Sequence, residues 1–140
     1  MTDGAVGLTI GEVARQTGLS VHTLRLYERE GLLTGAVTRD AAGRRIYRDW
    51  DVEWLLNCTK FRASGMPLAT IRRLAGLVGE GSGNEAERLA LLREHQQAVL
   101  ARMADLQACL ELISHKVEVY EAHVAQGTVG GVWSPAPARS

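Results

Sequence analysis

The sequence predicts a mainly α-helical chain, with a small helical head that contains one short β-hairpin and, after it, a long coiled-coil helix. Apolar residues make up 46% of the 140 residues and aromatic residues 5%, which favours a core of aliphatic side chains packed between helices. Capping residues and glycines divide the first part of the chain into short helical segments. From Leu89 onward, apolar residues recur at alternating intervals of three and four positions, which is typical of a coiled coil.

Two short helices open the chain. Thr9 and Glu12 have the spacing of a capping box and predict the start of the first helix, which Gly18 ends. Ser20 can cap a second helix, which ends at Gly31. Two short helices joined by a glycine-containing turn form a helix-turn-helix pattern.

The helical period then fails and later resumes. Residues 37–47 contain two β-prone stretches that flank the turn sequence Asp-Ala-Ala-Gly, which predicts a hairpin. Asp49 can cap a helix over about residues 50–63. Pro67 suits the first turn of the helix that follows.

The long helix carries an apolar seam that its own chain cannot cover. A strict seam of this kind pairs with another helix, and the head leaves no spare segment to supply one. We therefore predict that two copies of the chain pair through Leu89, Leu92, Val99, Met103, Leu106, Leu110, Ile113, Val117 and Tyr120. The predicted organisation is a head over residues 1–79, a flexible joint over 80–84, the dimerisation helix over 85–125 and a flexible tail over 126–140.

Composition excludes several classes of protein. The 16 Lys and Arg residues balance the 16 Asp and Glu residues, so the chain has no uniformly basic coat. Its two cysteines are too few for a disulfide framework or a four-cysteine zinc site. The sequence contains no phosphate loop, nucleophile elbow or zinc-protease motif, so no enzyme activity, catalytic residue, metal site or cofactor is predicted. No apolar run reaches the roughly 18–20 residues of a membrane span, and the first residues lack the basic region of a signal peptide. We expect a cytoplasmic protein with no membrane partner.

The head resembles the MerR family of transcription regulators. The likeness begins with the two short helices and with Thr-Leu-Arg-Leu-Tyr-Glu-Arg-Glu-Gly-Leu-Leu at residues 23–33. It continues through Gly-Arg-Arg-Ile-Tyr at 43–47, Asp-Val-Glu-Trp-Leu at 51–55 and Gly-Met-Pro-Leu at 65–68. The resemblance implies a winged helix-turn-helix head and a long helix that forms an antiparallel coiled coil. It also implies a dimer that distorts a promoter, with RNA polymerase as a further partner there.

The predicted DNA contacts lie on the second helix and on two wings. A recognition helix enters the major groove by its N-terminal end, which places His22, Thr23 and Arg25 near DNA. Tyr27 resembles a family position that touches the DNA backbone, and its alternative role is a buried ring in the core. The hairpin is predicted as the first wing and the end of the third helix as the second. In the first wing, the residues predicted to contact DNA are Arg39, Arg44, Arg45 and Tyr47. In the second wing they are Lys60 and Arg62. The alternative is a solvated turn with ordinary surface arginines.

Two cysteines are the candidate effector residues. The chain is most similar to the thiol- and aldehyde-responsive branch of the family, whose reactive cysteine aligns with Lys60. Cys58 lies two residues earlier, so that role does not carry over by position. Cys58 and Cys109 stay candidates, and the alternative for each is a small packing residue.

These observations predict a sequence-specific DNA-binding transcriptional regulator. It would bind a promoter as a dimer and distort the duplex in response to a small effector or stress signal. The alternative is a dimeric coiled-coil adaptor without specific DNA binding. The two hypotheses differ in duplex binding, which would depend steeply on salt for a regulator.

Overall fold

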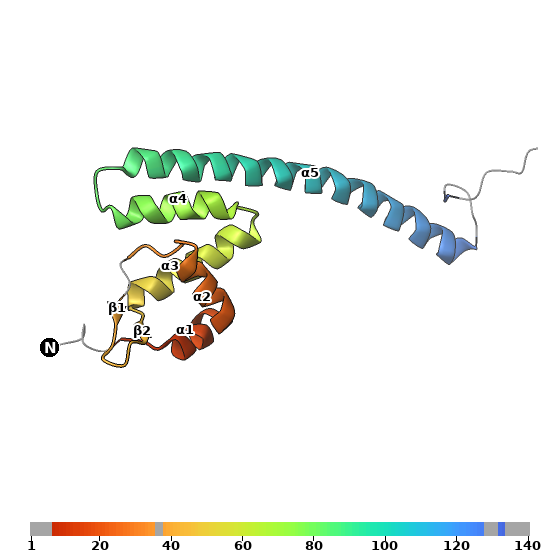
Figure 1. Cartoon of the computed structure of the whole chain (residues 1–140). Coiled ribbons are helices and arrows are strands. Elements are labelled where there is room, and N and C mark those ends of the chain that lie inside the picture. Colours follow the sequence, from red (N-terminus) through yellow and green to blue (C-terminus); the bar gives the residue numbers. More distant parts are fainter. Residues whose placement is uncertain (1–6, 36–37, 128–131, 134–140) are drawn as a thin grey trace, which may run out of the picture. The chain divides into compact units, whose positions relative to one another are not determined.

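The computed structural model describes residues 7–35, 38–127 and 132–133. It confirms the predicted fold class, because the described residues form helices and one two-stranded antiparallel hairpin (Figure 1). The chain divides into two compact units, Met1–Gln96 and Gln97–Ser140. The elements are α1 (Ile10–Thr17), α2 (Val21–Arg29), β1 (Thr38–Arg39), β2 (Arg45–Ile46), α3 (Asp49–Ala63), α4 (Leu68–Gly79) and α5 (Glu85–Gln126).

The helix-turn-helix prediction is confirmed at the level of its caps. The Thr9 hydroxyl accepts from the Glu12 backbone N–H at 3.1 Å, and the Glu12 carboxylate accepts from the Thr9 N–H at 2.8 Å. The bond that the carboxylate accepts from the Thr9 N–H is the main cause that lowers the pKa of Glu12. Gly18, with φ of 77°, ends α1 in the left-handed conformation that glycine adopts without strain. The Ser20 hydroxyl then caps α2 by accepting from the Thr23 N–H at 3.0 Å.

The hairpin pairs Thr38 with Ile46 and Arg39 with Arg45. The segment before α1 extends this small sheet through an isolated antiparallel bridge. In that bridge the Leu8 N–H donates to the Tyr47 carbonyl at 2.8 Å, and the Tyr47 N–H donates to the Leu8 carbonyl at 2.9 Å. The hairpin is therefore fastened to the beginning of the helical head.

The start of α3 differs from the prediction. Asp49 was expected to cap the helix, but it is the first helical residue and Arg48 holds the cap position. The Arg48 N–H donates to the Asp51 carboxylate at 2.9 Å. A carboxylate in the first turn thus accepts a hydrogen bond from the residue that precedes the helix. Its negative charge also complements the positive N-terminal end of the helix dipole.

One apolar core joins α1, α2, the hairpin, α3 and α4 within the first unit. Burial of each large aliphatic side chain stabilises the fold by about 1.5–3 kcal/mol relative to its exposure. The residues of this core with no exposed surface are Val13, Leu24, Leu32, Tyr47, Leu55, Cys58, Met66 and Ile71.

The second unit contains most of α5 and a short described part of the tail. Buried side chains are absent from the whole of α5. Beyond the helix, the backbone N–H of Trp133 donates to the Tyr120 hydroxyl at 3.0 Å. The Lys116 ammonium lies 4.7 Å from the centre of the Trp133 ring. Most of the predicted flexible tail lies outside the described residues. Among the described helices, none combines the length and the apolar character that a membrane crossing requires.

Candidate nucleic-acid interface

Helix α2 presents a polar side whose position is fixed by its apolar side. Leu24 is fully buried and Tyr27 is 6% exposed, whereas His22 and Arg25 are exposed. The Thr23 hydroxyl accepts from the Ser20 hydroxyl at 3.0 Å and keeps its own hydrogen for a further acceptor. The structure therefore brings His22, Thr23 and Arg25 together at the N-terminal end of one exposed helix side.

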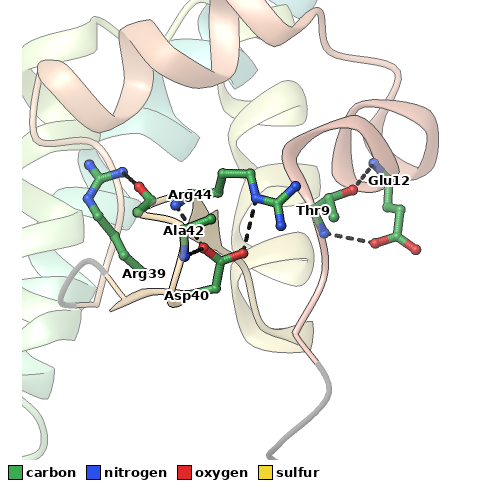
Figure 2. A network of polar contacts seen from close by, with 7 residues as sticks. Thr9, Glu12, Arg39, Asp40, Ala42 and Arg44 are labelled. Carbon is green, nitrogen blue, oxygen red and sulfur yellow. Dashed lines mark hydrogen bonds and ion pairs between the residues drawn. The ribbon is translucent and has the colours of Figure 1, made fainter.

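The turn of the hairpin is organised by one carboxylate. Figure 2 shows Asp40 accepting hydrogen bonds from the N–H groups of Ala42 and Arg44, each at 2.9 Å, and from the Arg44 side chain at 3.2 Å. These bonds, first of all the one from the Arg44 N–H, lower the pKa of Asp40. The Arg44 side chain stays largely exposed although it is paired.

The hairpin and α2 are joined by an ion pair. The Arg39 guanidinium lies 2.9 Å from the Glu28 carboxylate of α2, and it also donates to the Gly43 carbonyl at 3.2 Å. Half of the Arg39 side chain stays exposed. Glu28 thus holds the hairpin arginine beside α2.

A cleft of about 840 Å³ lies between the hairpin and α2. Its charged lining comes from Arg25 and Glu28 of α2 and from Arg39, Arg44 and Arg45 of the hairpin, with Asp40 in the turn. Four of these six groups are guanidinium groups, and three of them, those of Arg25, Arg39 and Arg44, are exposed enough to bind a phosphate-bearing ligand.

Two tyrosines and one arginine are less accessible than the sequence suggested. Tyr47 was predicted on the DNA backbone, but its ring is fully buried and cannot reach DNA in this structure. Arg45 is 8% exposed, and its guanidinium carbon lies 4.8 Å from the centre of the Tyr47 ring. Burial raises the pKa of Tyr47 and that of Tyr27. Tyr27 therefore matches its alternative role, since its ring belongs to the core.

The second predicted wing is a turn between α3 and α4. The Arg62 guanidinium donates to the Met66 carbonyl at 2.9 Å and so braces this turn, while Lys60 is exposed. Helix α4 begins directly after the turn, at Leu68. The first N–H groups of a helix suit a phosphate oxygen.

The two cysteines have opposite surroundings. Cys58 is fully buried in the core, and burial raises the pKa of its thiol to about 12. Cys109 is exposed on α5. The packing alternative therefore describes Cys58, whereas Cys109 is open to solvent in the single chain. Within the described ranges, no three His, Cys, Asp or Glu residues lie together in a group that could hold a metal ion.

Sequence reasoning missed the contacts that join distant segments. These are the Glu28–Arg39 pair, a hydrogen bond of 2.7 Å from the Trp54 indole to the Leu32 carbonyl, and a pair between Glu30 and Arg72. No local sequence signal marks them, because their members lie between 11 and 42 positions apart.

The fold is that of a helix-turn-helix protein whose arginine-lined cleft suits a phosphate-bearing ligand, and comparison with known proteins identifies its family. Residues 8–76 match the model of the MerR HTH family regulatory proteins, and residues 53–115 match that of the MerR DNA-binding region. An uncharacterised HTH-type transcriptional regulator of Haemophilus influenzae is 35% identical, over 91% of this chain and 93% of its own length. The chain belongs to the MerR family of DNA-binding transcriptional regulators.

Solved structures agree with this assignment. The crystal structure of HiNmlR, a MerR family regulator lacking the sensor domain and bound to promoter DNA, has a TM-score of 0.77 and 34% identity. The match covers 91% of this chain and all of that one. A MerR family regulator of Bacillus thuringiensis has a TM-score of 0.70 and 27% identity, over 82% of this chain and all of its own.

The different surroundings of the two thiols predict different reactivity. At pH 8 a thiol with a pKa of about 12 is ionised to roughly one part in 10⁴, so the buried Cys58 should react very slowly. Titration of the native protein with a thiol-reactive disulfide should show no more than one fast thiol for each chain, that of Cys109, and unfolding should make Cys58 reactive. Cys109→Ser should abolish the fast reaction and Cys58→Ser should leave it unchanged. A fast thiol that survives in Cys109→Ser would contradict this assignment.

Proposed function

We propose that this regulator binds a promoter as a homodimer, with one recognition helix in each of two half-sites. The observation that carries the proposal is the combination, in one chain, of an exposed α2 side with an arginine-lined cleft and an unpartnered apolar seam. The exposed side of α2 and the cleft suit a phosphate-rich duplex, and the apolar seam suits a second copy of the chain. The proposed organisation is a DNA-binding head over residues 1–79, a joint over 80–84, a dimerisation helix over 85–125 and a tail over 126–140.

The proposed DNA contacts fall into two groups. His22, Thr23 and Arg25 read base edges in the major groove, because they lie at the exposed N-terminal end of α2. Arg39, Arg44, Lys60 and Arg62 contact the flanking backbone and fix the register without reading sequence. Arg45 and Tyr47 support the hairpin from inside, and Tyr27 supports α2 from the core.

The proposed dimer rests on the exposed side of α5. Met103, Leu106, Leu110 and Ile113 are each more than half exposed, although apolar side chains at heptad spacing are normally buried in a coiled coil. A contiguous apolar stripe of this length on a soluble chain indicates an interface. Antiparallel pairing of two copies covers the stripe and holds the two heads at a fixed separation.

The signal and the further partners complete the proposal. The dimer acts in the cytoplasm, without a catalytic step, by distorting promoter DNA for RNA polymerase. The bending energy of the duplex depends on its sequence. A small effector or a stress signal shifts the equilibrium between undistorted and distorted promoter DNA. Of the two candidate thiols, Cys109 is exposed in the single chain and lies at the edge of the proposed dimer seam, whereas Cys58 is buried and lacks the exposure that a thiol sensor needs.

Fluorescence anisotropy with the DNA upstream of the protein's own gene, compared with a scrambled duplex, tests the DNA contacts. Binding should be selective and should weaken by orders of magnitude between about 50 and 200 mM salt. Arg25→Ala should cost about 1–3 kcal/mol of binding free energy on the selected DNA and relax sequence preference. Arg29→Ala is the matched control, because Arg29 is exposed in the last turn of the same helix. Equal losses on both duplexes would disprove base reading by Arg25.

Sedimentation equilibrium tests the proposed dimer interface. Leu106→Glu should convert the dimer into a monomer, because it places a charge in the middle of the apolar seam. Ala108→Glu adds the same charge to α5 outside the seam and should leave the dimer intact. A dimer that persists in Leu106→Glu would show that the seam is assigned wrongly.

A further inference from the structure

The C-terminal end of the recognition helix is tied to the head by side chains from two other helices. A helix end leaves its last carbonyl groups without partners inside the helix. Here the Leu32 N–H donates to the Tyr27 carbonyl at 2.9 Å, which closes the end of α2 locally. Just beyond it, the Trp54 indole of α3 donates to the Leu32 carbonyl at 2.7 Å. The second tie comes from α4.

Arg72 of α4 makes this second tie through two atoms of one residue. Its Nε donates to the Glu30 carbonyl at 2.7 Å, and its Nη2 lies 3.2 Å from the Glu30 carboxylate. Glu30 is the C-cap residue of α2. A guanidinium group suits this place because it is a planar donor fork and because a positive charge complements the negative end of the helix dipole.

Helix α4 is a firm support for this contact. Ile71, directly before Arg72, is fully buried, and Leu74 and Ala75 are almost fully buried. The backbone that carries Arg72 is therefore fixed by the core, while the arginine itself is about half exposed at the surface. The neighbouring Arg73 points to a different partner, the Glu87 carboxylate of α5, at 3.4 Å.

We propose that Arg72 is a positioning residue that sets the orientation of the recognition helix, and hence its sequence selectivity, without contacting a base. This inference rests on the proposed reading of DNA by α2. The residues expected to read bases lie at the N-terminal end of α2, and Arg72 holds the opposite end. Helix α2 is about 14 Å long at a rise of 1.5 Å per residue. A tilt of about 5° at the held end would therefore displace the reading end by roughly 1 Å.

A displacement of this size affects the two kinds of DNA contact unequally. Hydrogen bonds to base edges tolerate only a few tenths of an ångström and a narrow range of angles. Contacts to phosphate groups depend less on exact geometry, because long arginine and lysine side chains can keep their charge near a phosphate after a small displacement. Loss of the Arg72 contact should therefore weaken binding to the selected DNA more than binding to random DNA.

The test compares the affinities of the full-length protein for its selected duplex and for a scrambled one. Arg72→Ala should lower the ratio of the two affinities on the order of 2- to 30-fold, the range for residues that act on a site without touching the ligand. The thermal unfolding midpoint should change little, because an exposed ion pair contributes little to stability. Arg72→Lys should restore part of the ratio, because an ammonium group can bind one of the two acceptors. Arg73→Ala is the matched control: it removes the same charge from the next position of α4 and should leave the ratio unchanged.

Two results would overturn the proposal. If Arg72→Ala weakens binding to both duplexes by the same factor and reduces the dependence of affinity on salt, Arg72 contacts a phosphate directly. If Arg72→Ala changes neither the ratio nor the affinities, the contact with Glu30 has no role in DNA recognition. Failure of the parent protein to prefer its selected duplex would instead overturn the proposed function itself.

Discussion

The packing of the recognition helix against the core is the constraint on which the rest of the head depends. Because side chains follow the 3.6-residue period, burial of Leu24 and Tyr27 determines that His22 and Arg25 point away from the core. The fully buried Tyr47 links this core to the hairpin. The apolar core therefore decides which polar side chains of α2 are exposed, and these are the groups proposed to contact DNA.

The bounds of α1 and the start of α2 could be predicted from sequence because their signals are local, whereas the start of α3 was predicted one residue too late. Thr9 with Glu12, and Ser20, satisfy N–H groups only a few residues away, so spacing alone identifies them. The burial of Tyr47 could not be predicted in this way, because its ring lies in a core whose members come from several elements distant in the sequence. The residue types of the candidate site could likewise be predicted from sequence. The partners and the exposure of those residues could not, because they depend on contacts between distant segments.

The two units are suited to two different requirements of selective DNA binding, which are the reading of bases and the pairing of two heads. A single recognition helix contacts few base pairs, so a second head is needed for a site long enough to be selective. The apolar side of α5 is suited to bring that second head, because its heptad spacing continues far beyond what the chain can bury by itself. If two heads read the site together, the stability of the dimer and the selectivity for DNA are coupled, and a signal that changes one will change the other.

Paired, sequence-reading heads are tested most directly by selection of bound duplexes from a fully randomised DNA pool. A single sequence class should be enriched, and it should contain two inverted half-sites at a fixed separation, because two identical heads related by a two-fold axis would read it. Enrichment of one unrepeated site would contradict the paired heads. Recovery of unselected DNA after repeated rounds would contradict sequence-specific recognition by α2.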